Sequence, residues 1–290
     1  MSQTAKYYLG CPVWACEHWK GKLFPRNSRR GDWLPLYSQA FGTVEGNATF
    51  YGLPTISTVQ KWASQAEDGF HFALKFPRSI SHECRLAGAR AETDLFCECL
   101  EILLDADRLG PSFLQLPPDF GGEEFFRLEE YLRALPEKFP VAVEVRHGDY
   151  FQDPLKSRLL DLLHTLKMDR VIFDSRALFH FPPGDLTESE ARRRKPQVPI
   201  LKEVTGEFPF VRLVGINRIE KLDPWIEEWT DELAGWIRQG KTPYLFTHTP
   251  NDAFAPDFAR KFHLALQNKV EHLAPLPEWK GKGEQQMDLF

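Results

Sequence analysis

Residues 141–147 read VAVEVRH, a short apolar run that ends in charged side chains. Side chains alternate between the two faces of a β-strand, so Ala142, Glu144 and Arg146 would share one face and the valines the other. A charge buried in a strand is unfavourable unless it is paired. This stretch therefore predicts a buried strand whose downstream end meets a polar cavity.

Most other short apolar runs in the chain also carry a polar residue near the downstream end. The carboxyl ends of the strands of a parallel barrel lie together, so side chains placed there would meet in one cavity. The residues are Glu45 and Asn47 in FGTVEGNATFY, Lys75 in FHFALKFP, Gln115 in SFLQLPP, Asp174 in VIFDSR, Arg212 in FPFVRLVG and His248 in PYLFTHTP.

The apolar runs alternate about eight times with segments of helical spacing. Eight units favour an α/β fold of the (β/α)8 TIM-barrel class in a single domain, with an open doubly wound sheet as the alternative. The glycine-rich fingerprints GxGxxG and GxxxxGKS/T, common in open sheets, do not occur. We expect strands at 7–11, around 44, and at 70–76, 112–116, 141–145, 170–174, 210–214 and 243–247, and helices at 57–66, 91–106, 123–135, 154–166, 224–237 and 255–267.

No linker is evident inside the chain, so residues 1–278 are expected to form the barrel domain. Residues 279–290 are expected to form a flexible C-terminal tail. The stretch 181–199, which contains ARRRKP at 191–196, is expected to be an inserted loop or an irregular helix between strands six and seven.

Composition limits the partners that the protein can have. The chain has 290 residues, with 36 basic and 41 acidic side chains and a net charge of −5. This balance argues against a uniformly basic nucleic-acid-binding surface but leaves a local patch such as ARRRKP open. No apolar stretch approaches the roughly 20 residues of a membrane span, and no signal peptide is evident, so we expect a cytoplasmic protein. The five cysteines are expected to be reduced packing residues.

Alternation within each strand predicts which side chains face the interior. In HFALKF, Lys75 would point inward, opposite Phe72 and Phe76. In VIFDS, Val171 and Phe173 would face outward and Asp174 inward. An interior of carboxylates, arginines and a lysine suits an anionic ligand, because arginine grips carboxylate or phosphate with two hydrogen bonds.

The polar residues at the strand ends fall into catalytic candidates, which would perform acid/base catalysis, and substrate-binding candidates. The alternative is an internal salt-bridge network that fixes the strand register without chemistry. The catalytic candidates are Glu45, Lys75, Glu144, Asp174 and His248, and the substrate-binding candidates are Trp14, Asn47, Tyr51, His82, Gln115, Arg146 and Arg212.

Two other chemistries can be weighed against acid/base catalysis. Lys75 could form a Schiff base with a carbonyl substrate if burial lowered its pKa, but neighbouring carboxylates are expected to keep it charged. The carboxylates, His248 and His82 could hold a divalent metal. The cations would already neutralise those carboxylates, and no HExxH spacing occurs.

Eight segments in this order resemble the YecE-like proteins of the family called domain of unknown function 72: LGCPVWACEHW, VEGNATFYGLP, FALKFPRSISH, LQLPPDFG, VAVEVRH, FDSR, VRLVG and YLFTHTP. The resemblance spans nearly the whole chain and implies a TIM-barrel fold, but it supplies no established reaction. Many members have an Asn-Asn pair where this chain has His248 and Thr249. The version with histidine resembles the YecE branch of the family. The positions that match the family pattern are Glu45, Asn47, Thr49, Tyr51, Lys75, His82, Gln115, Glu144, Arg146, Asp174 and Arg212.

The last residues resemble the bacterial peptide that binds the DNA polymerase sliding clamp. Gln286 would supply polar recognition, while Met287, Leu289 and Phe290 would supply apolar contacts, on a tether rich in glycine and lysine. The alternative is that these residues cover the barrel.

Two functions therefore follow from the sequence. The first is an enzyme, of hydrolase or lyase class, that acts on a small anionic ligand or a nucleic-acid fragment. The second is a non-catalytic replication or repair factor that is recruited to the clamp.

Overall fold

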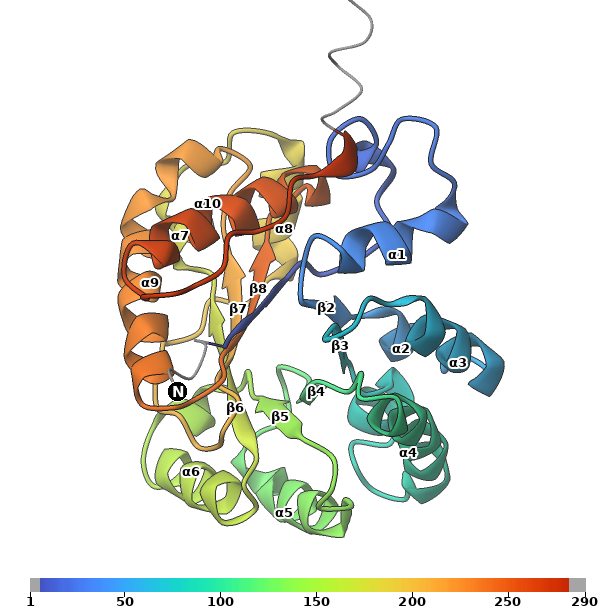
Figure 1. Ribbon diagram of the computed structural model, residues 1–290. Coiled ribbons are helices and arrows are strands. Elements are labelled where there is room, and N and C mark those ends of the chain that lie inside the picture. The colour runs from blue at the N-terminus through green and yellow to red at the C-terminus, as the bar shows by residue number, and fades with distance from the viewer. Residues whose placement is uncertain (1–5, 282–290) are drawn as a thin grey trace, which may run out of the picture.

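Eight parallel strands form the centre of the structure, a computed structural model that describes residues 6–281. Six strands form one curled sheet in the order β1-β8-β7-β6-β5-β4, and β2 pairs with β3 in a second sheet (Figure 1). The strands are β1 (Tyr8–Gly10), β2 (Thr43–Gly46), β3 (His71–Leu74), β4 (Ser112–Gln115), β5 (Val141–Glu144), β6 (Asp169–Asp174), β7 (Phe210–Val214) and β8 (Tyr244–His248).

Backbone contacts connect the two sheets on both sides. Parallel bridges link Phe72 to Leu109 and Lys75 to Phe113, which join β3 to the β4 segment. On the other side, the Glu45 amide of β2 donates to the Cys11 carbonyl, just after β1, at 3.1 Å. The strands therefore follow one another around a curled parallel sheet, with helices on its outside.

The six helices that apolar spacing predicts form as α3, α4, α5, α6, α9 and α10, within a few residues at each end, whereas the short helices α1, α2 and α7 are not predicted by it. The inserted stretch between β6 and β7 differs from the expectation, because it contains a regular helix, α8. The helices are α1 (Trp33–Ser38), α2 (Ala48–Tyr51), α3 (Ile56–Gln65), α4 (Arg90–Asp105), α5 (Phe125–Ala134), α6 (Leu155–Thr165), α7 (Arg176–His180), α8 (Leu186–Arg194), α9 (Asp223–Arg238) and α10 (Ala255–Gln267), with a π-helical turn at Ser79–Glu83 and 3-10 turns at Glu17–Trp19, Arg30–Asp32, Gly122–Glu124, Gly148–Phe151, Ile219–Lys221 and Asp252–Phe254.

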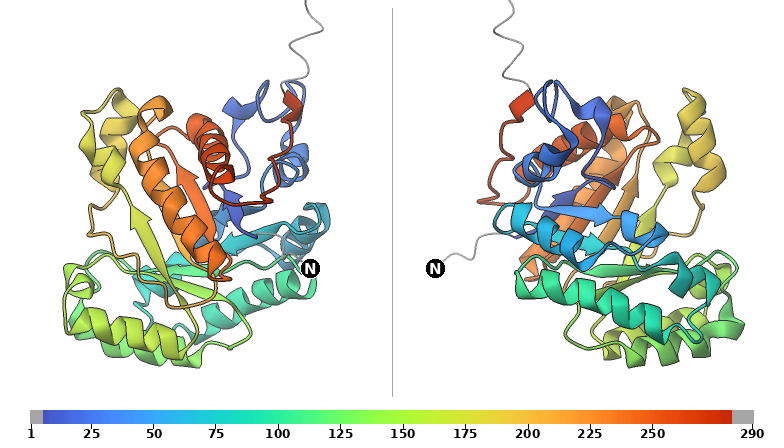
Figure 2. Two further views of the ribbon diagram at one scale, coloured as in Figure 1. Left: turned by 60° about the vertical axis from the view of Figure 1, so that its left-hand side comes forward. Right: turned by 90° about the vertical axis from the view of Figure 1, so that its right-hand side faces the viewer.

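The two faces of the strands fill two apolar layers. The outer layer lies between the strands and the helices, which surround them in all three views (Figures 1 and 2). The inner layer is enclosed by the curl of the sheet and is mainly aromatic, so it is packed rather than open. Its buried members are Tyr8, Ala73, Phe113, Ala142, Val171, Phe210, Tyr244 and Phe246.

Beyond α10 the chain runs back along the structure to Trp279, which is buried against Phe41 with the Arg260 guanidinium 3.9 Å above its ring. The predicted clamp-binding peptide at 286–290 lies outside the described residues. Within residues 6–281, no helix is both long and apolar enough to cross a membrane.

Candidate functional site

The carboxylate of Glu45, at the end of β2, is surrounded by donors from two other strands and from the residues just after β2. Arg212 of β7 grips it with two hydrogen bonds, from Nε at 2.8 Å and from Nη2 at 2.7 Å. His248 of β8 lies 2.9 Å from it through Nε2, and the Asn47 amide donates at 2.7 Å. Arginine geometry matches a carboxylate in this fork arrangement, which makes the contact strong as well as directional.

The remaining Arg212 nitrogen, Nη1, donates to Glu144 of β5. Glu144 also accepts from Arg146 Nε at 2.7 Å. Arg146 Nη2 in turn donates at 2.8 Å to Gln115 Oε1, and the same oxygen accepts from Lys75 Nζ at 3.0 Å. Side chains from or just after six strands are therefore joined in one network, which we call the strand-end network: Glu45, Asn47, Lys75, Gln115, Glu144, Arg146, Arg212 and His248.

The two carboxylates of the network are ionised and fully occupied. Burial alone would raise the pKa of Glu45, but Arg212 and then His248 outweigh it and hold the pKa well below its usual value. Burial also opposes ionisation of Glu144, and here Arg212 and Arg146 lower the pKa to about 2. Carboxylates held in this state are poor proton carriers near neutral pH.

Lys75 differs from what the sequence suggested. Its side chain is buried, its ammonium donates to the Gln115 amide oxygen, and the centre of the Phe50 ring lies 3.9 Å from Nζ. Among the described residues no carboxylate lies within ion-pair distance of Nζ. Burial, followed by the charge of Arg212, lowers the pKa of Lys75 to about 7. The sequence-based expectation is that neighbouring carboxylates keep this lysine charged; in the structure the arginines pair with those carboxylates, and Glu144 and Glu45 oppose the shift only in part.

Lys195 is a member of this region that the sequence did not identify. Its Nζ lies 6.0 Å from the centre of the Phe173 ring, and the guanidinium carbons of Arg146 and Arg212 lie 5.7 and 5.5 Å from the same ring. Lys195 is partly exposed, and among the described residues its ammonium makes no direct ion pair, although Asp252, Glu45 and Glu144 interact with its charge. Burial, then Arg212, lowers the pKa of Lys195 to about 8.

The segment that carries Lys195 is attached to the ends of β6 and β7. Glu188 of α8 is buried. Its carboxylate accepts a hydrogen bond from the Asn217 backbone amide at 2.9 Å and one from the Arg218 side chain at 2.8 Å. Ser175 donates to the Pro196 carbonyl at 2.8 Å, and Arg192 donates to backbone carbonyls at 178, 179 and 181. The basic run ARRRKP is therefore divided, with Arg192 turned into the fold and Lys195 close to the network.

Asp174 lies outside the network, and the predicted alternation for β6 is wrong. Its carboxylate accepts from Trp229 Nε1 of α9 at 2.7 Å and from the Arg176 backbone amide at 2.9 Å. The Arg176 side chain also pairs with it and continues to Glu228. Phe173 instead faces the network, because it is in register with Arg212 on β7, and side chains at one level of adjacent strands share a face.

Three other predicted binding residues lie around or beyond the rim. His82 hydrogen-bonds Ser81 Oγ through Nδ1 at 2.8 Å, and its ring packs edge-on to Phe50. Tyr51 is exposed beside Phe50. Trp14 packs on Trp62 of α3 and on Phe72 of the outer layer, so it supports the structure away from the network.

Both histidines near the network are neutral at physiological pH. Burial, the largest influence, lowers the pKa of His248 to about 4, although Glu45 opposes the shift. Burial and the charge of Lys75 lower the pKa of His82 to about 4. A neutral His248 must carry its proton on Nε2 to donate to Glu45, which leaves Nδ1 as an acceptor.

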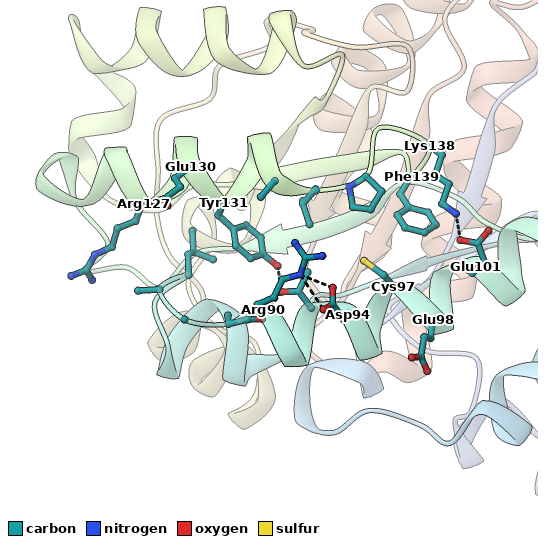
Figure 3. A pocket seen from close by; sticks show the side chains of 18 of the residues that line it. Arg90, Asp94, Cys97, Glu98, Glu101, Arg127, Glu130, Tyr131, Lys138 and Phe139 are labelled. Carbon is teal, nitrogen blue, oxygen red and sulfur yellow. Dashed lines mark hydrogen bonds and ion pairs between the residues drawn. The ribbon is translucent and has the colours of Figure 1, made fainter.

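A cavity of about 670 Å³ lies elsewhere, between α4 and α5 on the outside of the sheet (Figure 3). Tyr131, Phe139 and Cys97 form part of its apolar lining. Four of the charged side chains that line it form local pairs, Arg90 with Asp94 and Lys138 with Glu101. Within residues 6–281, no group of three or more His, Cys, Asp or Glu side chains is arranged to hold a metal ion.

Comparison with known proteins identifies relatives along almost the whole chain. The family model described as "Protein of unknown function DUF72" matches residues 8–281. The chain is 35% identical over 272 residues to the UPF0759 protein YecE of Escherichia coli K12, covering 93% of this chain and 96% of that protein. The UPF0759 protein YunF of Bacillus subtilis is 21% identical over 98% of this chain and 99% of its own length.

Two solved structures of DUF72 family proteins share the fold. The protein from Thermotoga maritima has a TM-score of 0.70 at 21% identity, covering 90% of this chain and 99% of that one. The protein from Enterococcus faecalis has a TM-score of 0.67 at 18% identity, covering 91% and 97%.

Proposed function

This chain belongs to the DUF72 family of proteins of unknown function, and from that premise we propose that its strand-end network binds a small anionic substrate and acts on it by proton transfer. The substrate would carry a phosphate or carboxylate group. The reaction would be of hydrolase or lyase class.

The observation that carries this proposal is the excess of cationic side chains over carboxylates. Glu45, Glu144 and, beside Lys195, Asp252 supply three carboxyl groups, whereas Arg212, Arg146, Lys75 and Lys195 supply four basic groups. Arg212 is consumed by Glu45 and Glu144, which leaves the other three basic groups with one direct ion pair among the described residues. An anion would supply the charge that this region lacks.

Access to solvent supports binding at Arg146 in particular. Its side chain retains 14% of its exposed area, whereas those of Glu45, Glu144 and Arg212 retain 4% or less. Arg146 and the partly exposed Lys195 both lie within 6.0 Å of the centre of the Phe173 ring. We therefore place the anionic group of the substrate between these two cations.

We further propose that Lys75, rather than the carboxylates, transfers protons in this site. A group is an efficient acid or base when its pKa is near the working pH. The pKa of Lys75 is about 7 and that of Glu144 about 2, so Lys75 is the better proton carrier at neutral pH. The carboxylates then serve to hold Arg212 and Arg146 in place.

The experiment is calorimetric titration with glycerol 3-phosphate, a phosphate ester without a carbonyl group. Arg146→Ala is expected to weaken binding by about tenfold or more, because it removes a charge-assisted contact. Arg133→Ala, which removes an exposed arginine of α5, is the matched control and should bind like the wild type. Equal binding by both variants, with melting curves showing both folded, would reject the anion site.

We also propose that the eight strands close into a complete (β/α)8 barrel. The bridges between β3 and β4 and the hydrogen bond from Glu45 to Cys11 support closure at the two sheet junctions. Hydrogen exchange tests this closure. We expect the amides at the two junctions to be protected from exchange as strongly as the amides between β7 and β8.

We propose recruitment to the sliding clamp as a second candidate function, which would use a part of the chain separate from the strand-end network. The sequence QMDLF at 286–290 is the observation that favours it. A nucleic-acid fragment would then be the local source of the anionic substrate.

A further inference from the structure

We propose that Lys75 is an amine nucleophile that forms a Schiff base with the carbonyl carbon of a substrate whose anionic group is held by Arg146 and Lys195. The inference rests on the proposed anion-binding function and adds a covalent step to it. It names the substrate class as a small aldehyde or ketone that bears a phosphate or carboxylate.

The first reason is the isolation of the Lys75 ammonium from carboxylates. Glu45 is taken up by Arg212 and His248, and Glu144 by Arg212 and Arg146. Lys75 is left with a neutral amide oxygen, that of Gln115, at 3.0 Å. A lysine in such a position loses the usual electrostatic stabilisation of its charged form.

The second reason is the packing around the amine. Lys75 is 7% exposed, and the Phe50 ring centre lies 3.9 Å from Nζ. The backbone of Lys75 is also fixed, since its carbonyl accepts a hydrogen bond from Thr49 Oγ1 at 2.6 Å. Desolvation favours the free amine that a reactive lysine needs, although the face of Phe50 attracts the charged form, and the fixed backbone holds the base of the side chain in place.

The third reason is the position of the amine relative to the anion-binding arginine. Lys75 Nζ and Arg146 Nη2 donate to the same Gln115 oxygen, at 3.0 and 2.8 Å. A ligand whose anionic group contacts Arg146 therefore places its neighbouring atoms next to Nζ. A carbonyl one or two bonds from that anionic group is within reach of the amine.

The step balances without a cofactor. The Nζ lone pair forms a bond to the carbonyl carbon, and the carbonyl π electrons move to oxygen. Both protons of the neutral amine leave with that oxygen as water, and a carbon–nitrogen double bond remains. Protonation of this imine gives an electron-withdrawing group, which is suited to breaking a carbon–carbon or carbon–hydrogen bond next to it.

The size of the effect follows from the free-amine fraction. At pH 7 about half of Lys75 is unprotonated, given its pKa of about 7, whereas an ordinary lysine is unprotonated in less than about one molecule in a thousand. The yield of imine formed with an aldehyde at Lys75 should therefore exceed the yield at an exposed lysine by about a hundredfold or more, if the aldehyde reaches both equally.

The experiment treats the full chain with glycolaldehyde phosphate and sodium borohydride at pH 7, followed by peptide mass spectrometry. Hydride addition to the imine carbon makes the adduct permanent. We expect one dominant adduct on the peptide that contains Lys75, and its loss in Lys75→Met and Lys75→Arg. Lys61→Met, which removes an exposed lysine of α3, is the control and should label like the wild type.

Two comparisons separate this proposal from the function on which it rests. Binding of glycerol 3-phosphate without any adduct at Lys75 would overturn the Schiff base and leave the anion site intact. Equal labelling of Lys75 by glycolaldehyde, which lacks the phosphate, would uphold the amine chemistry and reject the anion site. Adducts spread over surface lysines, unchanged in folded Lys75→Met, would also overturn the proposal.

Discussion

Arg212 donates hydrogen bonds of 2.8 and 2.7 Å to the carboxylate of Glu45, although their strands, β7 and β2, belong to different hydrogen-bonded sheets. The same guanidinium reaches Glu144 on β5. One buried cation therefore joins two carboxylates across the curl of the sheet. Removing one partner of such a cluster leaves the others as uncompensated buried charges.

Arg212→Met is expected to lower the free energy of unfolding by about 3–5 kcal/mol, because Glu45 and Glu144 lose their shared cation. Urea unfolding followed by circular dichroism measures the change. Arg133→Met, which breaks an exposed pair with Glu129, should cost less than about 1 kcal/mol. Similar values for the two variants would mean that the network does not stabilise the fold.

Glu144→Gln should flatten the acid side of the stability curve. The pKa of Glu144 is about 2 in the folded state and 4.5 ordinarily, so its contribution is present above pH 4.5 and is lost as pH falls toward 2. The loss in the wild type is on the order of 3 kcal/mol. Urea unfolding at a series of pH values should show a smaller slope in this window for the variant, and an unchanged slope would contradict the assignment.

Asp169→Asn should remove a loss of stability that the wild type shows as pH rises, at higher pH than the effect of Glu144. Burial raises the pKa of Asp169 from 3.8 to about 7, although the Phe208 amide donates to its carboxylate at 3.1 Å. Its contribution is therefore complete below pH 3.8 and is lost as pH rises to 7, by on the order of 4 kcal/mol. The variant should lose this decline, and the Glu144→Gln protein, measured alongside, should keep it.

Asp174→Ala should destabilise the fold without weakening ligand binding. The change leaves Trp229 Nε1 without its acceptor and Arg176 with one fewer carboxylate. The expected loss is about 1–3 kcal/mol in the free energy of unfolding, with the affinity for glycerol 3-phosphate unchanged. A variant that binds glycerol 3-phosphate more weakly while its stability is unchanged would show that Asp174 belongs to the binding site.

Deletion of residues 286–290 should weaken binding to purified sliding clamp by at least about tenfold, if the peptide supplies the anchoring contacts. Surface plasmon resonance on immobilised clamp measures the change. A variant with the same five residues in reversed order keeps the composition and should also fail to bind. Retained binding by either protein would reject residues 286–290 as the docking peptide, and absence of binding by the full chain would reject the clamp as a partner.

The sequence by itself determined the strands, the six helices with clear apolar spacing and most of the residues of the strand-end network. Alternating side chains specify the two faces of a strand, and the same period holds in β3, β5 and β7, where Lys75, Glu144 and Arg212 face the interior as expected. The positions of the helices follow from apolar spacing for the same local reason.

Tertiary structure alone decided which face of β6 is interior and how the charges are shared. The face depends on register, and Phe173, not Asp174, lies level with Arg212. The state of Lys75 depends on Arg212 and Arg146 occupying the nearby carboxylates, and the position of Lys195 depends on the attachment of α8. Pairing between side chains far apart in the chain is a property of three-dimensional distance, since Coulomb energy and desolvation depend on separation and burial rather than on sequence order.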